Sequence, residues 1–507
     1  MKRDGELTSL WQYKIPDYVS QTHDISSEVY DVLIVGGGIT GITTALLLQK
    51  AGMKCMLAEA RSIGFGTSGG TTAHLNTIMD SPYNIVEKNF GEDNAQLLAE
   101  VSRAAIEFVK SNVSQYNIKC DFSELEGYLF SQNDKQSEEL DDIFKASEKA
   151  GCEVEWVEKI PVPVEFEKAI VFNRQAQFHP AKYFYALAKA YENAGGILLQ
   201  LCRITKVKEN DVLEIESSRG IINARKMIYA THVPPGVNLL HFRCAPYRSY
   251  AMAIKLKADN YPDALAYDMH EPYHYYRTQI IDGEKFLIAG GEDHKTAHEE
   301  NTEMCFTRLE SYLKKYFEIE QVAFRWSSQY FEPADGLPYI GNLPGNGDNV
   351  FVATGFGGNG ITYSQVAAMI LTDLIVAGTS KYEKIFNPNR IKPVAGFANF
   401  VKESADVVGE FIGKWFSSSK INELSEIAKD EARVVKYEGH SIALYKDENG
   451  NFHAVNPACT HINCVVGWNN AEKTWDCPCH GSRFSMDGEM LTAPARKDLE
   501  KIDLTSA

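Results

Sequence analysis

Four potential metal ligands near the C-terminal end constrain the fold of this chain most strongly. Cys459 and His461 form a C-x-H pair, and Cys477 and His480 form a C-x-x-H pair fifteen residues later. Two cysteines and two histidines in paired loops suit a two-iron cluster in which thiolates hold one iron and imidazoles the other. One tetrahedral zinc ion could use the same ligands, but zinc fingers usually pair Cys with Cys and His with His. The mixed pairing favours the cluster, and zinc stays the alternative.

This spacing resembles the Rieske [2Fe–2S] motif, which implies one cluster held by these four ligands. The resemblance implies a small all-β domain at about 421–507, and strand patterns at 432–437, 441–445 and 452–456 agree with it. Relatives of the respiratory type have a disulfide between the two cluster loops, so the resemblance implies a bridge between Cys464 and Cys479, although disulfides are rare in cytosolic proteins.

The same resemblance implies two influences on the cluster. Ser482 is expected to hydrogen-bond a bridging sulfide. Phe484 stands where high-potential relatives have a tyrosine donor. One hydrogen bond fewer to sulfur should lower the reduction potential, so we expect a potential below that of the respiratory type.

A glycine-rich turn near the N-terminus predicts a dinucleotide site. The apolar run 29–35 indicates a buried parallel strand, and it is followed by Gly36-x-Gly38-x-x-Gly41 and a helical run. A second strand then ends at Glu59, whose carboxylate can accept hydrogen bonds from an adenosine ribose. The glycines permit a tight turn, close approach of a pyrophosphate and close helix–strand packing.

Later segments add to this signal in chain order. The stretch 64–74 is rich in Gly, Ser and Thr, as in a backbone that wraps a ligand. A strand ending in Ala230-Thr231 follows, then D-G-L-P-Y-I-G at 335–341 and A-T-G-F-G-G-N-G-I at 353–361. Over about residues 28–385 the chain resembles the D-amino-acid oxidase-like FAD oxidoreductases. The loop at 68–73 departs from the family pattern at several places.

The resemblance implies a fold class and a set of FAD contacts. We expect an α/β Rossmann-like FAD-binding domain with an interleaved α+β substrate domain, followed by the all-β Rieske domain. The expected FAD-binding residues are Gly36, Gly38, Ile39, Thr40, Gly41, Glu59, Ala60, Arg61, Thr67, Ser68, Thr71, Thr72, Ala73, Val207, Gly355, Gly357, Gly358, Asn359, Gly360, Ile361 and Thr362.

We expect the following domain boundaries. After an N-terminal lead segment (1–27), the oxidoreductase spans 28–385. Its FAD-binding parts are about 28–85, 150–235 and 325–380, and its substrate parts are about 86–149 and 236–324. A linker (386–420) with an amphipathic helix at 397–416 leads to the Rieske domain. That helix is expected to dock on the flavin domain, with a membrane surface as the alternative.

Candidate substrate residues lie on a predicted strand at 272–278. Tyr273, Tyr275 and Arg277 alternate there and would share one face. A planar guanidinium between phenols suits a substrate carboxylate, and glycine oxidase-like relatives carry such an arginine on this strand, so we assign Arg277 and Tyr275 to that role. An ordinary sheet face is the competing interpretation, and Arg248 with Tyr250 is the second pair. His74 could attach FAD covalently, but an ordinary loop histidine is the preferred interpretation.

The two resemblances together imply an electron relay. In the flavin family a hydride leaves a carbon that bears an amine and reduces FAD, and a cluster accepts electrons singly. We therefore expect a dehydrogenase for a small amine or amino acid that passes electrons through the cluster to an external acceptor, a protein or a quinone. The alternatives are a hydroxy-acid dehydrogenase, reversed electron flow, a redox sensor and a cluster with a structural role only.

Composition excludes several classes of partner. The 507-residue chain has a formal net charge of −17, which argues against nucleic acid and against an anionic membrane surface. No signal peptide and no apolar stretch of membrane-spanning length is recognisable, so we expect a cytoplasmic protein.

Overall fold

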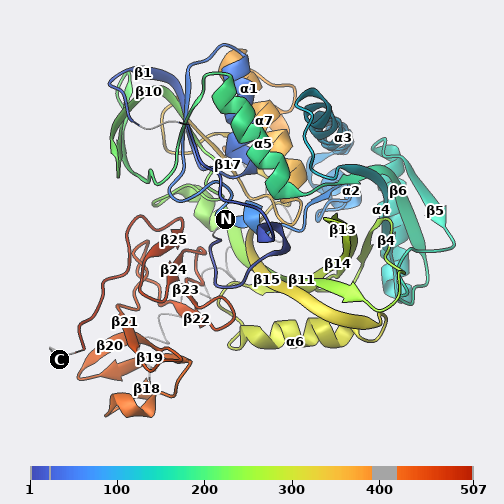
Figure 1. Cartoon of the computed structure of the whole chain (residues 1–507). Helices are drawn as coiled ribbons and strands as arrows, with labels where there is room; N and C mark the ends of the chain where they lie inside the picture. The colour runs from blue at the N-terminus through green and yellow to red at the C-terminus, as the bar shows by residue number, and fades with distance from the viewer. Residues whose placement is uncertain (1–2, 22–23, 391–418, 505–507) are drawn as a thin grey trace.

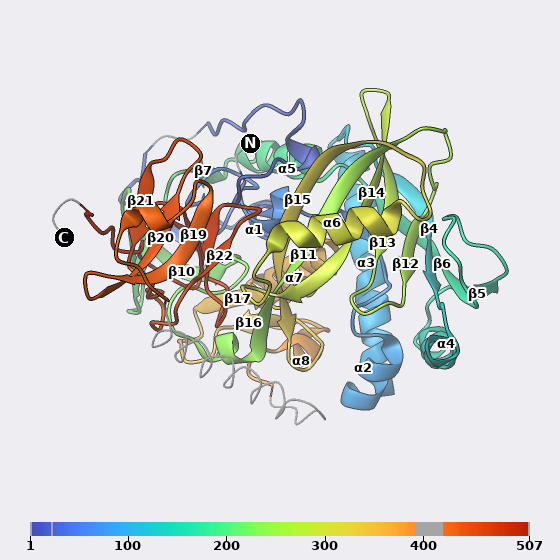
Figure 2. The ribbon, with the colours of Figure 1, turned by 90° about the horizontal axis from the view of Figure 1, so that it is seen from below.

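The chain builds two large mixed sheets and a small C-terminal pair of sheets (Figure 1). The computed structural model describes residues 3–21, 24–390 and 419–504. The amphipathic segment expected at 397–416 therefore lies outside the described residues. The C-terminal strands lie at the opposite end of the molecule from helix α4 (Asp134–Lys149; Figure 2).

The first sheet contains the strand–glycine–helix unit predicted near the N-terminus. β1 (Val29–Val35) runs parallel to both of its neighbours, β2 (Cys55–Ala58) and β10 (Gly220–Tyr229), and is buried from Val32 onward. Continuous apolar residues suit a strand that is covered on both faces. The other strands of this sheet are β7 (Ile197–Leu199), β8 (Ile204–Lys208), β9 (Leu213–Ser217), β16 (Tyr339–Asn342) and β17 (Val350–Thr354).

Three helices pack together beside this sheet (Figure 1): α1 (Ile39–Lys50), α5 (Pro180–Asn193) and α7 (Gly360–Val376). α1 and α7 are apolar around most of their circumference, as expected for buried helices. Thr40 on α1 donates a hydrogen bond to the hydroxyl of Ser364 on α7 over 2.9 Å. The N-termini of the two helices therefore lie close together, each just after a glycine-rich turn.

The second sheet has nine strands, and helix α6 (Thr302–Leu313) packs on it (Figure 2). Its order places the long antiparallel pair β15 and β11 at one edge. The strands in order are β15 (Ile319–Pro333), β11 (Cys244–Leu256), β14 (Glu284–Lys295), β13 (Tyr275–Ile281), β12 (Leu265–Asp268), β4 (Ser123–Phe130), β6 (Ala169–Gln177) and β3 (His74–Leu75), with β5 (Val154–Val157) paired to β6.

The sheet pairings cross the expected boundaries between FAD-binding and substrate parts, and that division stays a prediction. β5 and β6 lie within 150–235, the range expected in the FAD-binding part, yet both belong to the second sheet because β6 pairs antiparallel with β4. β15 likewise carries the second sheet to Pro333, beyond the expected boundary near 324. The helical pattern at 86–150 corresponds to α2 (Tyr83–Phe90), α3 (Glu92–Gln115) and α4.

The C-terminal part contains two four-stranded sheets; one apolar core joins the two sheets, and a second core lies on the first sheet alone. The first has β18 (Ser419–Lys420), β19 (Glu431–Tyr437), β20 (His440–Lys446) and β21 (Phe452–Val455), and the second has β22 (Gly467–Asn469), β23 (Thr474–Asp476), β24 (Arg483–Ser485) and β25 (Met490–Thr492). The loop after β21 and the loop between β23 and β24 carry the four predicted ligands. Across the described ranges, none of the helices has the length and apolarity needed to span a bilayer.

Candidate flavin and cluster sites

The turn after β1 has the shape that a dinucleotide phosphate needs. Gly36 has a φ of 113°, and a Cβ there would lie 2.4 Å from the carbonyl oxygen of Ala230. A Cβ on Gly41 would lie 1.9 Å from the carbonyl oxygen of Gly36. Side chains at these positions would block the turn or separate α1 from the sheet. The residues therefore fit a pyrophosphate at the N-terminus of α1.

Glu59 and Arg61 follow β2 at the same edge of the sheet. The carboxylate of Glu59 accepts hydrogen bonds from the backbone N–H of Gly37 at 2.6 Å and of Arg61 at 2.7 Å, and burial raises its pKa. This position suits a ribose. The guanidinium of Arg61 instead reaches the C-terminal domain, where it donates to Glu489 and to the carbonyl of Met490.

The N-terminal segment forms hydrogen bonds to residues 67–73, which we call the flavin loop. Ser9 donates to the carbonyl of Gly69 over 2.7 Å, and the indole N–H of Trp11 donates to the carbonyl of Thr71. Leu10 and Trp11 are fully buried. At the other end of the loop, Ser68 accepts a hydrogen bond from the backbone N–H of Ile39 at 3.0 Å. The expected lead segment is thus part of the packing around the flavin loop.

Arg277 lies under the flavin loop and is fully buried. Its Nη1 donates to the carbonyl oxygens of Thr72 at 3.0 Å and Ala73 at 2.7 Å, and its Nη2 donates to Gln279. The guanidinium also lies 5.5 Å from the centroid of the Trp11 ring. Its assignment to a substrate carboxylate stays a prediction, and these contacts weigh against it.

The second glycine-rich turn precedes α7 and meets Asp80. Gly355 and Gly357 have φ values of 75° and 55°, and a Cβ on Gly357 would lie 2.7 Å from Oδ2 of Asp80. The Asp80 carboxylate accepts a hydrogen bond from the N–H of Gly358, and its own N–H donates to Asn359 over 2.8 Å. The exposed side chain of Asp80 therefore holds this turn just before the N-terminus of α7.

A group of acids and phenols lies beside this turn, and we call it the acid–phenol group; Tyr275 is buried, Tyr273, Asp293 and Tyr330 are half-buried, and Asp80 is exposed. Tyr273 places its hydroxyl 2.7 Å from a Cβ built on Gly358, and Tyr330 donates to Oδ2 of Asp293 over 2.9 Å. Oδ1 of Asp293 is buried without a hydrogen-bond partner. Partial burial raises the pKa of Asp293 to about 7. The members are Asp80, Tyr273, Tyr275, Asp293 and Tyr330.

Tyr275 and His74, two further candidates from the sequence, have hydrogen-bond partners in the structure. Tyr275 lies within hydrogen-bond distance of the Ser249 hydroxyl, at 3.2 Å. Nδ1 of His74 lies 2.7 Å from the hydroxyl of Tyr267, and burial lowers its pKa well below the usual range. His74 therefore lies on β3 with a neutral imidazole.

The predicted cluster ligands fit a metal centre. Cys459 and Cys477 are buried thiols, and their mutual hydrogen bond is the main reason why the pKa of Cys459 is lowered. Both ring nitrogens of His461 and Nδ1 of His480 are buried without partners. Burial lowers their pKa values to about 4 and about 3, so both imidazoles are neutral. Neutral imidazoles and a readily formed thiolate are what iron requires.

The positions of the sulfurs argue against a single zinc ion at these ligands. Within residues 3–21, 24–390 and 419–504, the ligand atoms that gather in a group of three within 4.8 Å belong to Cys464, Cys477 and Cys479. Cys464 and Cys479 are joined in a disulfide in the structure, so only Cys477 of that group can bind a metal. The four predicted ligands are more widely spread, as a two-iron cluster needs. Ser482 directs its hydroxyl to the sulfur of Cys459.

The flavin domain covers the histidine side of the cluster loops. His241 lies in the short helix η3 (Leu239–Arg243), with its ring centroid 4.9 Å from that of His461 and 5.9 Å from that of His480. The neighbouring Phe242 approaches His480 edge-on at 5.2 Å. The predicted imidazole ligands therefore face the flavin domain.

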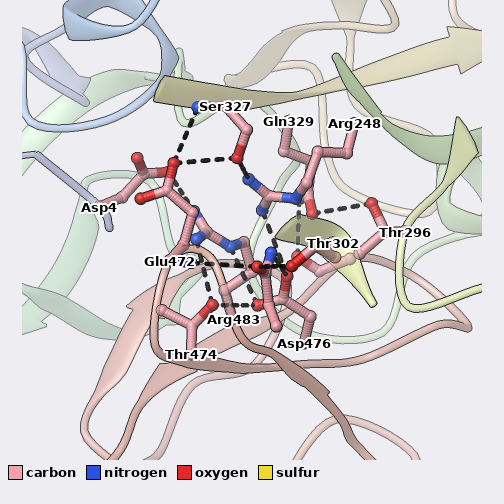
Figure 3. A network of polar contacts seen from close by, with 12 residues as sticks. Asp4, Arg248, Thr296, Thr302, Ser327, Gln329, Glu472, Thr474, Asp476 and Arg483 are labelled. Carbon is pink, nitrogen blue, oxygen red and sulfur yellow. Dashed lines mark hydrogen bonds and ion pairs between the residues drawn. The ribbon is translucent and has the colours of Figure 1, made fainter. Parts of the chain in front are cut away.

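Buried ion pairs lock the C-terminal domain onto the rest of the chain (Figure 3). Arg483 contacts Asp4 at 2.6 Å and Asp476 at 3.1 Å, and Asp476 also contacts Arg248 at 3.3 Å. Three arginines face three acids, and their side chains are at most 3% exposed. We call this set the interdomain clamp: Arg3, Asp4, Arg248, Glu472, Asp476 and Arg483.

The predicted FAD residues at 36–41 and 59–61 follow β1 and β2 at the carboxyl edge of the first sheet, and their contacts with FAD stay a prediction. Val207 lies on the outer hairpin, where it lines a cavity of about 230 Å³ together with Arg496 of the C-terminal domain. Arg248, from the second candidate substrate pair, belongs to the clamp. The sequence patterns indicated Tyr273 and Tyr275 but not the clamp, η3, Asp80, Asp293 or Tyr330, because no local pattern marks long-range polar contacts.

Comparisons with known proteins agree with both halves of the site. The sequence model of the family described as FAD dependent oxidoreductase (DAO) matches residues 31–374, and that of the Rieske [2Fe-2S] domain matches residues 415–503. A Bacillus subtilis (strain 168) protein described as putative Rieske 2Fe-2S iron-sulfur protein YhfW is 35% identical over 477 residues, 94% of this chain and 93% of that protein.

More distant relatives match the flavin part. Gamma-glutamylputrescine oxidoreductase of Escherichia coli (strain K12) is 22% identical over 374 residues, which cover 70% of this chain and 86% of that protein. The crystal structure of glycine oxidase from Geobacillus kaustophilus has a TM-score of 0.60 at 17% identity, covering 72% of this chain and 100% of that one. The predicted fold class is thereby confirmed.

Proposed function

We propose that this chain, which belongs to the DAO family of FAD dependent oxidoreductases and carries a C-terminal Rieske [2Fe-2S] domain, oxidises a small amine or amino acid and passes the electrons singly through the cluster. When bound, FAD would supply the acceptor for a hydride from the carbon that bears the amine, with the amine proton released to water, and the cluster would supply a one-electron carrier to an external one-electron acceptor. The imine product would be hydrolysed in water.

The observation that carries the amine assignment is the acid–phenol group beside the flavin turns. Asp293 is half-buried beside Tyr273 and Tyr330, its Oδ1 atom is buried without a hydrogen-bond partner, and Asp80 is exposed at the same turn. Carboxylates and aromatic faces attract an ammonium ion. An anionic hydroxy acid would meet repulsion there. The named activities of the two distant relatives, on gamma-glutamylputrescine and on glycine, also concern amines.

The contacts between the domains support an internal relay. The predicted histidine ligands face η3 of the flavin domain, and the interdomain clamp holds this arrangement. The proposed relay would operate within this arrangement of the domains. The flavin loop and the glycine turns would hold FAD, and Cys459, His461, Cys477 and His480 would hold the cluster.

Anaerobic mixing with a panel of compounds tests the proposed function. The panel contains amino acids, N-methyl amines and diamines, with matched hydroxy acids as controls. We expect at least one amine to bleach the flavin, followed by the EPR signal of the reduced cluster. Bleaching by a hydroxy acid, with every amine inactive, would refute the amine assignment. Flavin bleaching without a cluster signal would refute the relay.

A further inference from the structure

One residue of the flavin domain touches the loops of both predicted centres. Gln329 on β15 accepts a hydrogen bond through its main-chain carbonyl from the hydroxyl of Thr67 in the flavin loop, at 2.8 Å. Its side-chain amide donates to the carbonyl of Gly481 at 2.8 Å. Gly481 lies between His480 and Ser482 in the second cluster loop. Gln329 is therefore hydrogen-bonded to both loops directly.

The orientation of the Gln329 amide is set by its surroundings (Figure 3). The hydroxyl of Thr296 lies 3.1 Å from Oε1 of Gln329 and donates to it, which leaves Nε2 to face the carbonyl of Gly481. A carbonyl can only accept, so the amide cannot be turned the other way without loss of that bond. Gln329 is only 2% exposed, and water does not compete for these contacts.

The second cluster loop lies so close to β15 that a side chain at position 481 would not fit, and this position requires glycine. A Cβ on Gly481 would lie 2.8 Å from Nε2 of Gln329, 2.8 Å from Cβ of Pro246 and 3.0 Å from the ring of Phe331. Its φ of 74° also favours glycine. On the flavin side, the ring of Phe331 packs edge-on against His232 at 4.6 Å. The ring of Phe331 therefore packs between Gly481 of the second cluster loop and His232 on the flavin side.

The interdomain clamp holds both the strand that carries Gln329 and the cluster loop that Gln329 contacts. Ser327, two residues before it on the same strand, accepts a hydrogen bond from Arg248 at 2.8 Å and donates one to Glu472 at 2.9 Å. Arg248 in turn contacts Asp476, the last residue before Cys477. Both ends of the cluster loop are therefore tied to β11 and β15.

We propose that Gln329 is a positioning residue for electron transfer within the chain, because it holds the flavin loop and the cluster loop at a fixed separation. The inference rests on the proposed function. In each transfer the reduced flavin loses one electron and the oxidised cluster gains it, with no bond made or broken. Gln329 acts through the loops and does not itself change oxidation state.

Gln329→Met tests this role in the holoenzyme, because Met is similar in length and cannot donate to Gly481. The flavin is reduced with light and EDTA, which bypasses the substrate, and cluster reduction is followed by EPR and absorbance. We expect cluster reduction to slow by about tenfold or more, as for other small misplacements of reacting groups. The flavin spectrum, the EPR line shape and the midpoint potential of the cluster should match the wild type.

Thr278→Val is the control, because it removes a hydrogen bond to the carbonyl of Pro262 in the same sheet and touches neither loop. It should keep the wild-type rate. Equal slowing in both variants, or a wild-type rate in Gln329→Met with an intact EPR signal, would overturn the inference. If Gln329→Met loses its cluster, Gln329→Asn, whose shorter amide cannot reach Gly481, must give the same slowing.

The same experiment separates this inference from the proposed function. If light-reduced flavin does not reduce the wild-type cluster, the proposed relay is wrong and the inference falls with it. If the wild type transfers electrons and Gln329→Met equals it, only the inference is wrong. If no amine reduces the flavin but the light-driven transfer depends on Gln329, the substrate assignment alone fails.

Discussion

Asp293 is the residue that we expect to affect the binding of a positively charged substrate most. Burial raises its pKa to about 7, so its carboxylate is protonated below that pH and negatively charged above it. For an amine that stays protonated over this range, kcat/KM should rise as the pH increases through about 7. Asp293→Asn should abolish this rise and lower kcat/KM at higher pH by about tenfold or more, which corresponds to about 1.4 kcal/mol.

The control for this pH profile is Asp211→Asn, which changes an exposed acid on the outer hairpin. It should leave the profile unchanged. A wild-type profile in Asp293→Asn would remove Asp293 from substrate binding.

Single residues also show where sequence patterns stop being informative. The four cluster ligands and the glycines at 36, 38 and 41 could be predicted, because their chemistry fixes both residue type and spacing. Arg277 has the residue type that was expected for a carboxylate ligand, but its nitrogens contact the carbonyls of Thr72 and Ala73. The partners of a buried arginine depend on chain segments distant in sequence, which one sequence does not reveal.

At the scale of elements, the two cluster loops are joined by the bridge between Cys464 and Cys479. Its sequence separation of 15 residues corresponds to about 3 kcal/mol of stabilisation in the chain-entropy model. Cys464→Ser should therefore lower the temperature at which the cluster absorbance is lost, and strong reductants should affect the wild type in the same way. Cys152→Ser, at a free cysteine outside this domain, is the control. Unchanged cluster stability in Cys464→Ser would show that the bridge does not support the loops.

The N-terminal segment gives a second prediction at this scale. Trp11 is fully buried and binds the flavin loop through its indole N–H. Trp11→Ala should lower the free energy of unfolding by about 3–5 kcal/mol and weaken FAD retention during gel filtration. Trp156 is 43% exposed, so Trp156→Ala should cost less and leave FAD bound. Equal FAD retention in the two variants would contradict a role of the segment in holding the loop.

Helices and strands whose apolar residues recur at a regular spacing could be predicted from the sequence. Elements that are defined by contacts between distant segments could not. The helices near 39–50 and 180–193 and the strands at 431–446 follow from apolar spacing and turn residues. The burial of residues 9–11 was not expected, because a short polar segment with two apolar residues has no period. The placement of β5 and β6 in the second sheet was missed for a similar reason, since strand pairing over long separations leaves no local mark.

On the scale of the whole molecule, the interdomain clamp determines how the two domains sit together. Asp4 faces Arg483 at 2.6 Å with both side chains buried. Asp4→Ala leaves a buried arginine short of a partner, which should cost about 3–5 kcal/mol in the free energy of unfolding measured with urea. Glu28→Ala breaks an exposed pair with Lys54 and should have little effect. Equal stability of the two variants would show that the clamp does not hold the domains.

The clamp also predicts how stability depends on pH. Burial opposes ionisation of Asp4 and Asp476, but the facing arginines, Arg483 foremost, lower the pKa of both acids below their usual value. Such acids stabilise the folded state above the unfolded pKa of about 4, and this contribution is lost as the pH falls through the folded pKa. The melting temperature should therefore fall below about pH 4, and less steeply in Asp4→Asn. The same slope in both proteins would contradict this account.

The central claim is that the two centres exchange electrons within one chain, and its most direct test is the concentration dependence of cluster reduction. After light-driven reduction of the flavin in the wild-type holoenzyme, the rate at which the EPR signal of the cluster appears is measured over a hundredfold dilution. The fixed interface predicts a first-order rate constant that does not change with protein concentration. A rate that falls in proportion to concentration would show transfer between molecules and contradict the account.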